Sequence, residues 1–202
     1  MTGSLAPVGL VLAGGRSSRM GRDKATLEVG GQLLVQGQIR TLRRAGIQDI
    51  FLSLPPEGPS PVPEIPVVRD RREGMGPLAG IVAGLEAGAP RPILVLAVDM
   101  PQVQPRFLRK LLDRSRSGVG VAPRIGDRWE PLCAIYPTEA LALAQGFLTG
   151  DHRSPSALLD ALQAAGLVEA APVPSSSTAT LKSWNRPDDL PEDVQEAHDP
   201  AT

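Results

Sequence analysis

Short apolar runs alternate along the chain with segments of helical periodicity. The apolar runs, each predicted to be a strand, are residues 8–13, 50–54, 67–68, 93–98 and 131–136. The segments predicted to be helices are residues 33–45, 77–88, 105–115, about 138–146 and 154–165. Strands that alternate with helices are typical of α/β proteins, in which helices cover a central sheet. We therefore predict an α/β fold with a central, mostly parallel sheet.

Glycine and proline mark the places where this pattern is interrupted. Gly30 and Gly31 separate residues 26–29 from residues 32–34 and predict a hairpin. Gly46 follows a helix whose apolar positions recur every three or four residues, and we expect it to end that helix. Six prolines fall within residues 55–66, which excludes regular helix and central strand and predicts a stiff surface loop.

Composition and charge narrow the class of protein. The 202 residues are 42% hydrophobic, and we expect one domain over residues 1–190, followed by a polar tail over residues 191–202. A net charge of −1 gives no overall attraction to nucleic acid or to an anionic membrane. No run approaches the ~20 apolar residues that span a bilayer, so we expect a cytoplasmic protein. Cys133 is the only cysteine, which excludes an internal disulfide, and its apolar neighbours predict a buried core thiol.

The loop after the first apolar run combines glycines, hydroxyls and positive charge. From Leu12 to Lys24 it reads L-A-G-G-R-S-S-R-M-G-R-D-K. Gly14 and Gly15 lack a Cβ, so the backbone here can approach a ligand closely and can take positive φ. Arg19 offers a planar fork for two phosphate oxygens, and Lys24 offers a point charge suited to a leaving pyrophosphate. The loop therefore predicts a triphosphate site.

Two common phosphate-binding loops do not match this stretch. The dinucleotide fingerprint needs G-x-G-x-x-G, whereas Gly14 and Gly15 are adjacent and the next glycine is Gly21. The P-loop needs G-K followed by serine or threonine, whereas Lys24 lies between an aspartate and an alanine. A dehydrogenase-type domain is disfavoured for the same reason.

The loop resembles the signature L-A-G-G-x-S-x-R-M-G-x-D-K of the nucleotidyltransferase superfamily. Within it the chain is most similar to the molybdenum cofactor guanylyltransferases, the family of molybdopterin-guanine dinucleotide biosynthesis protein A. The resemblance implies a Rossmann-like three-layer nucleotidyltransferase fold and transfer of GMP from GTP to molybdenum-molybdopterin, with release of pyrophosphate. It implies that Arg19 and Lys24 are catalytic. The implied nucleotide-binding residues of the loop are Leu12, Ala13, Gly14, Gly15, Arg19 and Lys24.

Acidic residues that directly follow predicted strands are candidates for ligand or metal contacts, because ligands of such sheets bind beyond the carboxyl ends of the strands. Asp99 directly follows residues 93–98, and Mg²⁺ prefers one or two carboxylates completed by waters and phosphate oxygens. On the residues alone, a turn-forming aspartate beside Pro101 is the stronger interpretation. The stretch V-D-M-P resembles a family segment whose aspartate binds magnesium, which implies a catalytic, metal-binding and nucleotide-binding Asp99 and a Mg²⁺ cofactor.

Other stretches also resemble family segments near the nucleotide. Asp70 matches a family position that contacts the nucleotide, and an ion pair with a neighbouring arginine is the weaker alternative. Ser53 stands where some members carry a nucleotide-binding asparagine. G-P-L-A-G, which ends at Gly80, resembles a family stretch that opens a helix, and for Ala79 and Gly80 we favour a role in close packing.

The second substrate is matched by two weaker segments. E-P-L from Glu130 to Leu132 resembles a family segment, and residues 183–190 resemble the family ending N-x-N-T-P-E-D-L. That ending keeps Asn185 but has Ser183 and Arg186 where asparagine and threonine are usual. The resemblance implies Glu130 and Asn185 as pterin-substrate residues, while helix initiation explains residues 186–189 as well.

The sequence is compatible with several functions. Related cytidylyl enzymes tend to carry L-A-A-G, so Gly14 leaves room for guanine and favours GTP over CTP. The alternatives are a molybdopterin cytidylyltransferase, another small nucleotidyltransferase, and a non-catalytic nucleotide-binding regulator. Beyond GTP and molybdenum-molybdopterin, the family implies transient contact with other proteins of cofactor biosynthesis. We expect no nucleic-acid or membrane partner, and a monomer or a weak oligomer.

Overall fold

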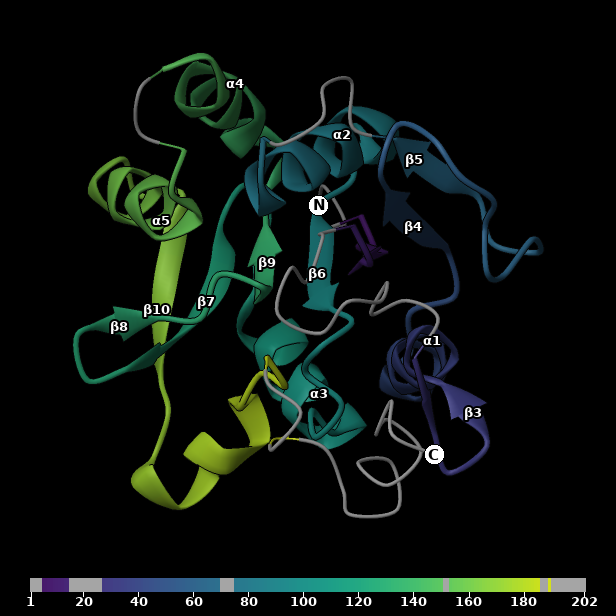
Figure 1. The fold of residues 1–202 in the computed structure, drawn as a ribbon. Coiled ribbons are helices and arrows are strands. Elements are labelled where there is room, and N and C mark those ends of the chain that lie inside the picture. The colour runs from purple at the N-terminus through teal and green to yellow at the C-terminus, as the bar shows by residue number, and fades with distance from the viewer. Residues whose placement is uncertain (1–4, 15–26, 70–74, 151–152, 186–188, 190–202) are drawn as a thin grey trace.

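The computed structural model describes residues 5–14, 27–69, 75–150, 153–185 and 189 (Figure 1). Its strands are β1 (Val8–Leu12), β2 (Glu28–Val29), β3 (Gln32–Leu33), β4 (Ile50–Leu54), β5 (Val67–Arg69), β6 (Ile93–Ala97), β7 (Gly120–Ile125), β8 (Arg128–Trp129), β9 (Cys133–Tyr136) and β10 (Val168–Pro172). Its α-helices are α1 (Leu34–Ala45), α2 (Pro77–Gly88), α3 (Pro105–Arg114), α4 (Leu141–Thr149) and α5 (Pro155–Ala164). Short 3-10 helices cover Thr138–Ala140 and Ser175–Leu181.

The main sheet places β1 at the centre of its parallel half. The strand order is β10-β7-β9-β6-β1-β4-β5, and β8 pairs with β7. β1 runs parallel to both β4 and β6, so Leu12 lies abreast of Ser53 on one side and Ala97 on the other. β9 joins the two halves by running antiparallel to β6 and to β7. The predicted α/β fold with a mostly parallel sheet is confirmed.

Helices cover both faces of this sheet. α1 and α3 pack on one face, and α2, α4 and α5 pack on the other (Figure 1). Val11 of β1 belongs to the first core, whereas its neighbours Leu10 and Leu12 belong to the second. A strand buried on both faces needs apolar residues at every position, which explains the unbroken apolar run of β1. Each fully buried side chain of this size stabilises the fold by about 1.5–3 kcal/mol.

The glycine and proline predictions are confirmed with one refinement. Gly30 and Gly31 have φ of 58° and 73° in the hairpin turn between β2 and β3, and Gly46 has φ of 105° at the end of α1. The proline-rich stretch contains no helix or strand. It is more than a surface loop, however, because Val62 and Ile65 are buried in the core beside α1.

Strands β7, β8 and β10 were not predicted from the sequence. β10 follows Gly166, contains two small alanines and ends at Pro172, so it lacks the branched apolar run that marks β1 and β6. It lies at the edge of the sheet, where a proline does not interrupt a second ladder of hydrogen bonds. The predicted tail, residues 191–202, lies outside the described residues.

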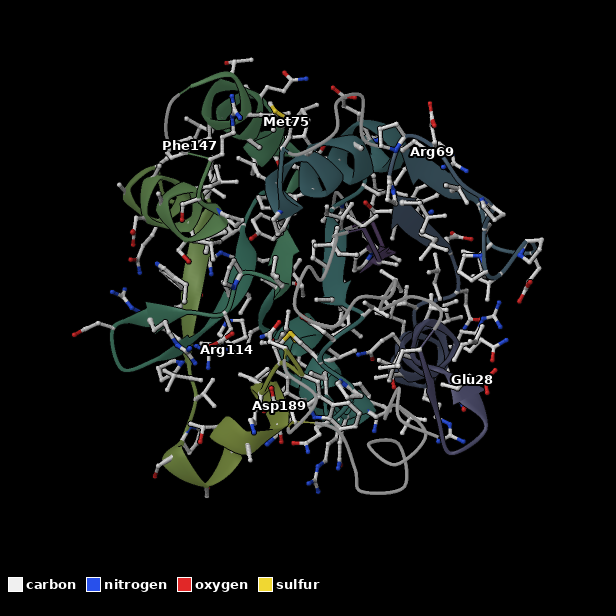
Figure 2. All side chains as sticks on the ribbon, viewed as in Figure 1. Glu28, Arg69, Met75, Arg114, Phe147 and Asp189 are labelled. Atoms are coloured by element: carbon white, nitrogen blue, oxygen red, sulfur yellow. The ribbon has the colours of Figure 1, made fainter. Side chains whose placement is uncertain are left out.

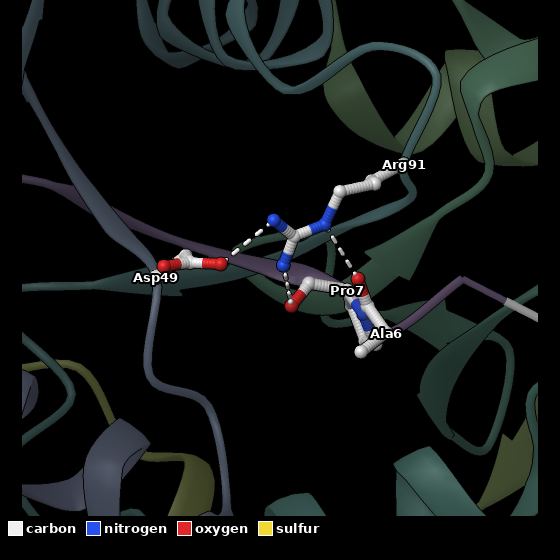
Figure 3. A network of polar contacts seen from close by, with 4 residues as sticks. All are labelled: Ala6, Pro7, Asp49 and Arg91. Atoms are coloured by element: carbon white, nitrogen blue, oxygen red, sulfur yellow. Dashed lines mark hydrogen bonds and ion pairs between the residues drawn. The ribbon is translucent and has the colours of Figure 1, made fainter.

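Arg91 joins the amino ends of the parallel strands (Figure 3). Its Nε donates to Ala6 O at 2.8 Å and its Nη2 donates to Pro7 O at 3.4 Å, just before β1. Its Nη1 lies 2.7 Å from Asp49 Oδ2, just before β4. Because Arg91 itself precedes β6, one guanidinium holds the starts of three adjacent strands together.

Candidate functional site

Asp99 lies in a tight turn at the carboxyl end of β6. The Met100 N–H donates to Ala97 O at 3.3 Å and closes the turn around Val98 and Asp99. Val98 and Met100 are buried, whereas Asp99 is partly exposed and has one buried carboxylate oxygen. The apolar neighbours therefore fix the backbone while the carboxylate stays at the edge of the sheet, where the sequence predicted it.

Three distant segments meet at this turn through backbone hydrogen bonds. The Val98 N–H donates to Leu12 O at 3.0 Å, at the start of the glycine loop. The Ala97 N–H donates to Leu132 O at 2.8 Å, in the segment that begins at Glu130. The Trp184 N–H donates to Asp99 O at 2.8 Å. The structure thus brings together the start of the loop predicted to bind the nucleotide, the aspartate predicted to bind metal, and the two segments that resemble second-substrate segments of the family.

The nucleotide side of the site is bounded by β1 and β4. The Ala13 N–H donates to Ser53 O at 3.0 Å, which extends the pairing of the two strands beyond Leu12. Ser53 is only 2% exposed. A Cβ placed on Gly80 of α2 would lie 2.5 Å from Ser53 Oγ and 2.7 Å from Leu12 Cδ2. This close approach supports the packing interpretation of Gly80, and it places the Ser53 hydroxyl against α2.

Gly14 occupies an exposed position next to these strands. Its φ is not in the positive region, so its conformation does not require glycine. A Cβ on Gly14 would approach protein atoms of Leu54 and Pro55 no closer than 3.6 Å, an ordinary contact. The absence of a side chain here is therefore not demanded by local packing of the described residues and leaves space at the surface. Gly15, Arg19, Lys24 and Asp70 lie outside the described residues.

Glu130 begins the segment that contacts β6. Its Oε1 lies 2.6 Å from Arg128 Nη2, an ion pair by distance without the alignment of a hydrogen bond, and its side chain is 13% exposed. Burial raises the pKa of the Glu130 carboxyl above its ordinary value, and the charge of Arg128 partly offsets this rise. Glu130 is thus a carboxylate held in a partly dehydrated position near the site.

Asn185 follows the residue that binds the Asp99 turn. Its backbone N–H donates to Asp189 Oδ2 at 3.0 Å, and Asp189 Oδ1 lies 2.8 Å from Lys182 Nζ. Figure 2 labels Asp189, which follows the 3-10 helix Ser175–Leu181 in the chain. The sequence pointed to Asn185 but gave no role to Trp184, because a backbone contact leaves no mark on the choice of side chain.

A pocket of about 140 Å³ lies beside the turn. It is lined by Pro101, by Gln38 and Gly37 of α1, and by residues of β2 and β3 and the connection into α1. The sequence did not predict this pocket, because its walls come from two segments more than sixty positions apart. One of the two glutamines that line it, Gln38, interrupts an otherwise apolar helix face.

The residues around Asp99 fit a magnesium ion that is completed by a ligand. Among the described residues, no group of three or more His, Cys, Asp or Glu side chains could hold a metal by itself. Mg²⁺ is commonly bound through one or two carboxylates plus waters and substrate phosphates, so a partly exposed Asp99 is a suitable donor.

Cys133 is buried on β9, as predicted. Burial raises the pKa of its thiol far above the ordinary value, so the nucleophilic thiolate is disfavoured. Within the described part of the chain, no helix is both long and apolar enough to cross a bilayer.

The fold is shared with solved structures of α/β proteins that include nucleotidyltransferases. The structure superposes on the molybdopterin-guanine dinucleotide biosynthesis protein A of Archaeoglobus fulgidus with a TM-score of 0.70, 23% identity and coverage of 94% and 97% of the two chains. A cytidylyltransferase of Thermus thermophilus, which acts on 2-C-methyl-D-erythritol 4-phosphate, gives a TM-score of 0.66 at 21% identity, with coverage of 96% and 99%. At these identities the likeness concerns the fold alone.

The chain belongs to the MobA-like NTP transferase family, whose model matches residues 9–165. A probable molybdenum cofactor guanylyltransferase of Opitutus terrae is 41% identical over 187 residues, which are 91% of this chain and 93% of the relative. A protein of the same description from Mycobacterium ulcerans is 33% identical over 199 residues, with 94% of each chain covered. The family predicted from the loop at Leu12 is confirmed.

Proposed function

We propose that this protein transfers GMP from GTP to the terminal phosphate of molybdenum-molybdopterin, forming molybdopterin guanine dinucleotide and pyrophosphate. The family and the near full-length similarity to a probable guanylyltransferase support this reaction. The structural observation that supports it most strongly is that Leu12, Leu132 and Trp184 all form backbone hydrogen bonds with the Asp99 turn. This arrangement supports the proposal that the nucleotide and the second substrate bind on adjacent sides of one carboxylate.

The reaction needs alignment and charge neutralisation more than a protein base. A phosphomonoester with a second pKa near 6 is already largely dianionic at pH 7, so it can attack the α-phosphorus of GTP directly. Arg19 and Lys24 are proposed to neutralise the triphosphate, and Glu130 and Asn185 to contact the pterin substrate. Asp99 would hold a Mg²⁺ ion, which neutralises charge on the phosphate oxygens when bound.

The backbone of residues 12–14 is proposed to read the base, together with a contact from Asp70. Ser53, which is 2% exposed and whose hydroxyl lies against α2, is proposed to support this nucleotide edge rather than to contact the base directly. Gly14 supports guanine because a side chain at this exposed position would take up space next to the β1–β4 edge. A purine needs more of that space than a pyrimidine. We also propose that the protein hands its product to other proteins of cofactor biosynthesis through transient contacts, and that it is cytoplasmic.

Thermal-shift titrations with GTP, CTP, ATP and UTP in the presence of Mg²⁺ test the base. We expect stabilisation by GTP above the other nucleotides, and stabilisation by CTP alone would contradict the guanylyl assignment. Asp99→Asn should abolish pyrophosphate release from GTP and molybdenum-molybdopterin while leaving the melting temperature unchanged. Asp113→Asn, at an exposed position of α3, is the matched control and should keep full activity.

A further inference from the structure

Gln38 is a polar residue in an otherwise apolar environment. It lies on the inward face of α1 with Leu34, Val35, Ile39 and Leu42, and it is 2% exposed. Among the described residues, Ser53 is the only other polar or charged residue buried to this degree. Helical periodicity alone would place a leucine or methionine at this position.

The orientation of the Gln38 amide is set by its partner. Its Nε2 donates to Ala97 O at 3.1 Å. A carbonyl oxygen can only accept, so the NH₂ group must face Ala97 and the amide oxygen must face elsewhere. Gln38 Oε1 is buried and has no hydrogen-bond partner in the described part of the molecule. An unpartnered buried acceptor lowers stability, so packing alone does not account for glutamine here.

The contact falls on the carbonyl that closes the Asp99 turn. Ala97 O accepts both from Met100 N, 3.3 Å away within the turn, and from Gln38 Nε2 on a different element. The second bond restrains the start of the turn from the side of α1. The backbone bonds to Leu132 O and from the Trp184 N–H restrain the turn from other sides, whereas the Gln38 bond uses a side chain.

We propose that Gln38 is a positioning residue that fixes the turn and thereby aligns Asp99 for magnesium and nucleotide. This inference rests on the proposed function. Gln38 acts through Ala97 and touches no reacting atom, and its polar group is retained at the expense of stability. Groups that orient a metal ligand in this indirect way commonly change metal affinity by about tenfold or more when they are removed.

The test compares Gln38→Met with Gln36→Met. Both remove a glutamine amide from α1, but Gln36 is exposed and serves as the control. For Gln38→Met we expect an equal or higher melting temperature, faster hydrogen exchange at the Met100 amide without ligand, and an increase of about tenfold in the Mg²⁺ concentration that half-saturates turnover. Gln36→Met should change none of these quantities.

Two results would overturn the proposal. One is a folded Gln38→Met protein with unchanged Met100 exchange and an unchanged Mg²⁺ requirement. The other is loss of folding in both Gln38→Met and Gln38→Leu, because a purely structural residue predicts that loss and a positioning residue predicts retained stability. Asp99→Asn separates the proposed function from this inference: if this variant keeps turnover with the Mg²⁺ requirement of the unmodified protein, the metal role of Asp99 fails, and Met100 exchange alone then decides whether Gln38 holds the turn.

Discussion

The amino and carboxyl edges of the parallel strands are held by different groups. At the amino edge, one charged side chain, Arg91, binds the segments that precede β1 and β4 (Figure 3). At the carboxyl edge, backbone amides join the Asp99 turn to Leu12, Leu132 and Trp184. The carboxyl edge is thus joined through backbone groups of the Asp99 turn, whereas at the amino edge a charged side chain joins the segments that precede the strands.

This difference predicts that substitutions at the two edges will separate stability from activity. Changes at the carboxyl edge should lower turnover or substrate affinity with little effect on folding. Changes at the amino edge should lower the free energy of unfolding with little effect on turnover. Four substitutions, ordered by the size of the expected effect, test this division.

The largest effect is expected for Lys24→Ala in the loop that follows β1. Removing the charge proposed to neutralise the leaving pyrophosphate should lower kcat by about 10³-fold, or about 4 kcal/mol of transition-state stabilisation. Steady-state kinetics and a thermal melt measure the two quantities. Lys110→Ala, at an exposed position of α3, is the control. Turnover of Lys24→Ala within a factor of two of the unmodified protein would remove Lys24 from the catalytic set.

The next effect is expected for Asn185→Ala. Its side chain is proposed to contact the pterin substrate, while its backbone N–H to Asp189 survives the substitution. The KM for molybdenum-molybdopterin should rise about tenfold, equivalent to about 1.4 kcal/mol, and stabilisation by GTP should not change. A loss of GTP stabilisation instead would place Asn185 on the nucleotide side or show that the ending supports the whole turn.

Most of the fold was predictable because its dominant signals are local. The apolar runs of β1 and β6 are continuous since these strands are buried on both faces, and Gly46 and Pro77 mark the helix ends where the structure has them. β8 and β10 are short or poor in branched residues, and they become strands only because β7 offers them partners. Pairing of that kind is a tertiary effect that a local pattern does not encode.

The sequence indicates parts of the candidate site where the type of side chain is informative. Asp99 and the loop from Leu12 to Lys24 are candidates by residue type and spacing, together with a resemblance, and their roles stay predictions. The contacts of Trp184 with Asp99 and of Gln38 with Ala97 were not predicted, since one uses a backbone amide and the other joins residues 59 positions apart. The sequence indicates Gln38 only as a polar residue on an apolar helix face.

At the amino edge, Arg91→Ala should affect stability alone. The substitution removes bonds to two backbone carbonyls and to Asp49 from a guanidinium that is 31% exposed. We expect a loss of about 1 kcal/mol, which lowers the melting temperature by about 2–4 °C in a chain of this size, with kcat unchanged. Asp49→Ala should cost less because the carbonyl contacts remain. A fall in kcat without a fall in stability would contradict the division between the edges.

The smallest effect is expected for Glu130→Gln. This substitution tests whether a carboxylate at the carboxyl edge of the strands lowers the free energy of unfolding. Burial raises the folded-state pKa of Glu130 above its value in the unfolded chain, so the folded protein holds this proton more tightly. The stabilisation from this proton is fully present below the unfolded pKa and is lost as the pH rises through the folded pKa. A neutral glutamine avoids burying the charge, so the variant should gain about 0.5 kcal/mol at pH 7.5 and nothing near pH 4.

Urea unfolding of the two proteins at several pH values measures this gain. The exposed Arg128 loses a partner in the variant at little cost, because surface pairs contribute weakly. Curves of stability against pH that run parallel would mean that Glu130 is solvated well enough to carry its charge freely. Curves that converge toward low pH would mean that the carboxyl edge keeps a partly dehydrated carboxylate at the expense of stability, as expected of a group retained for its contact with a substrate.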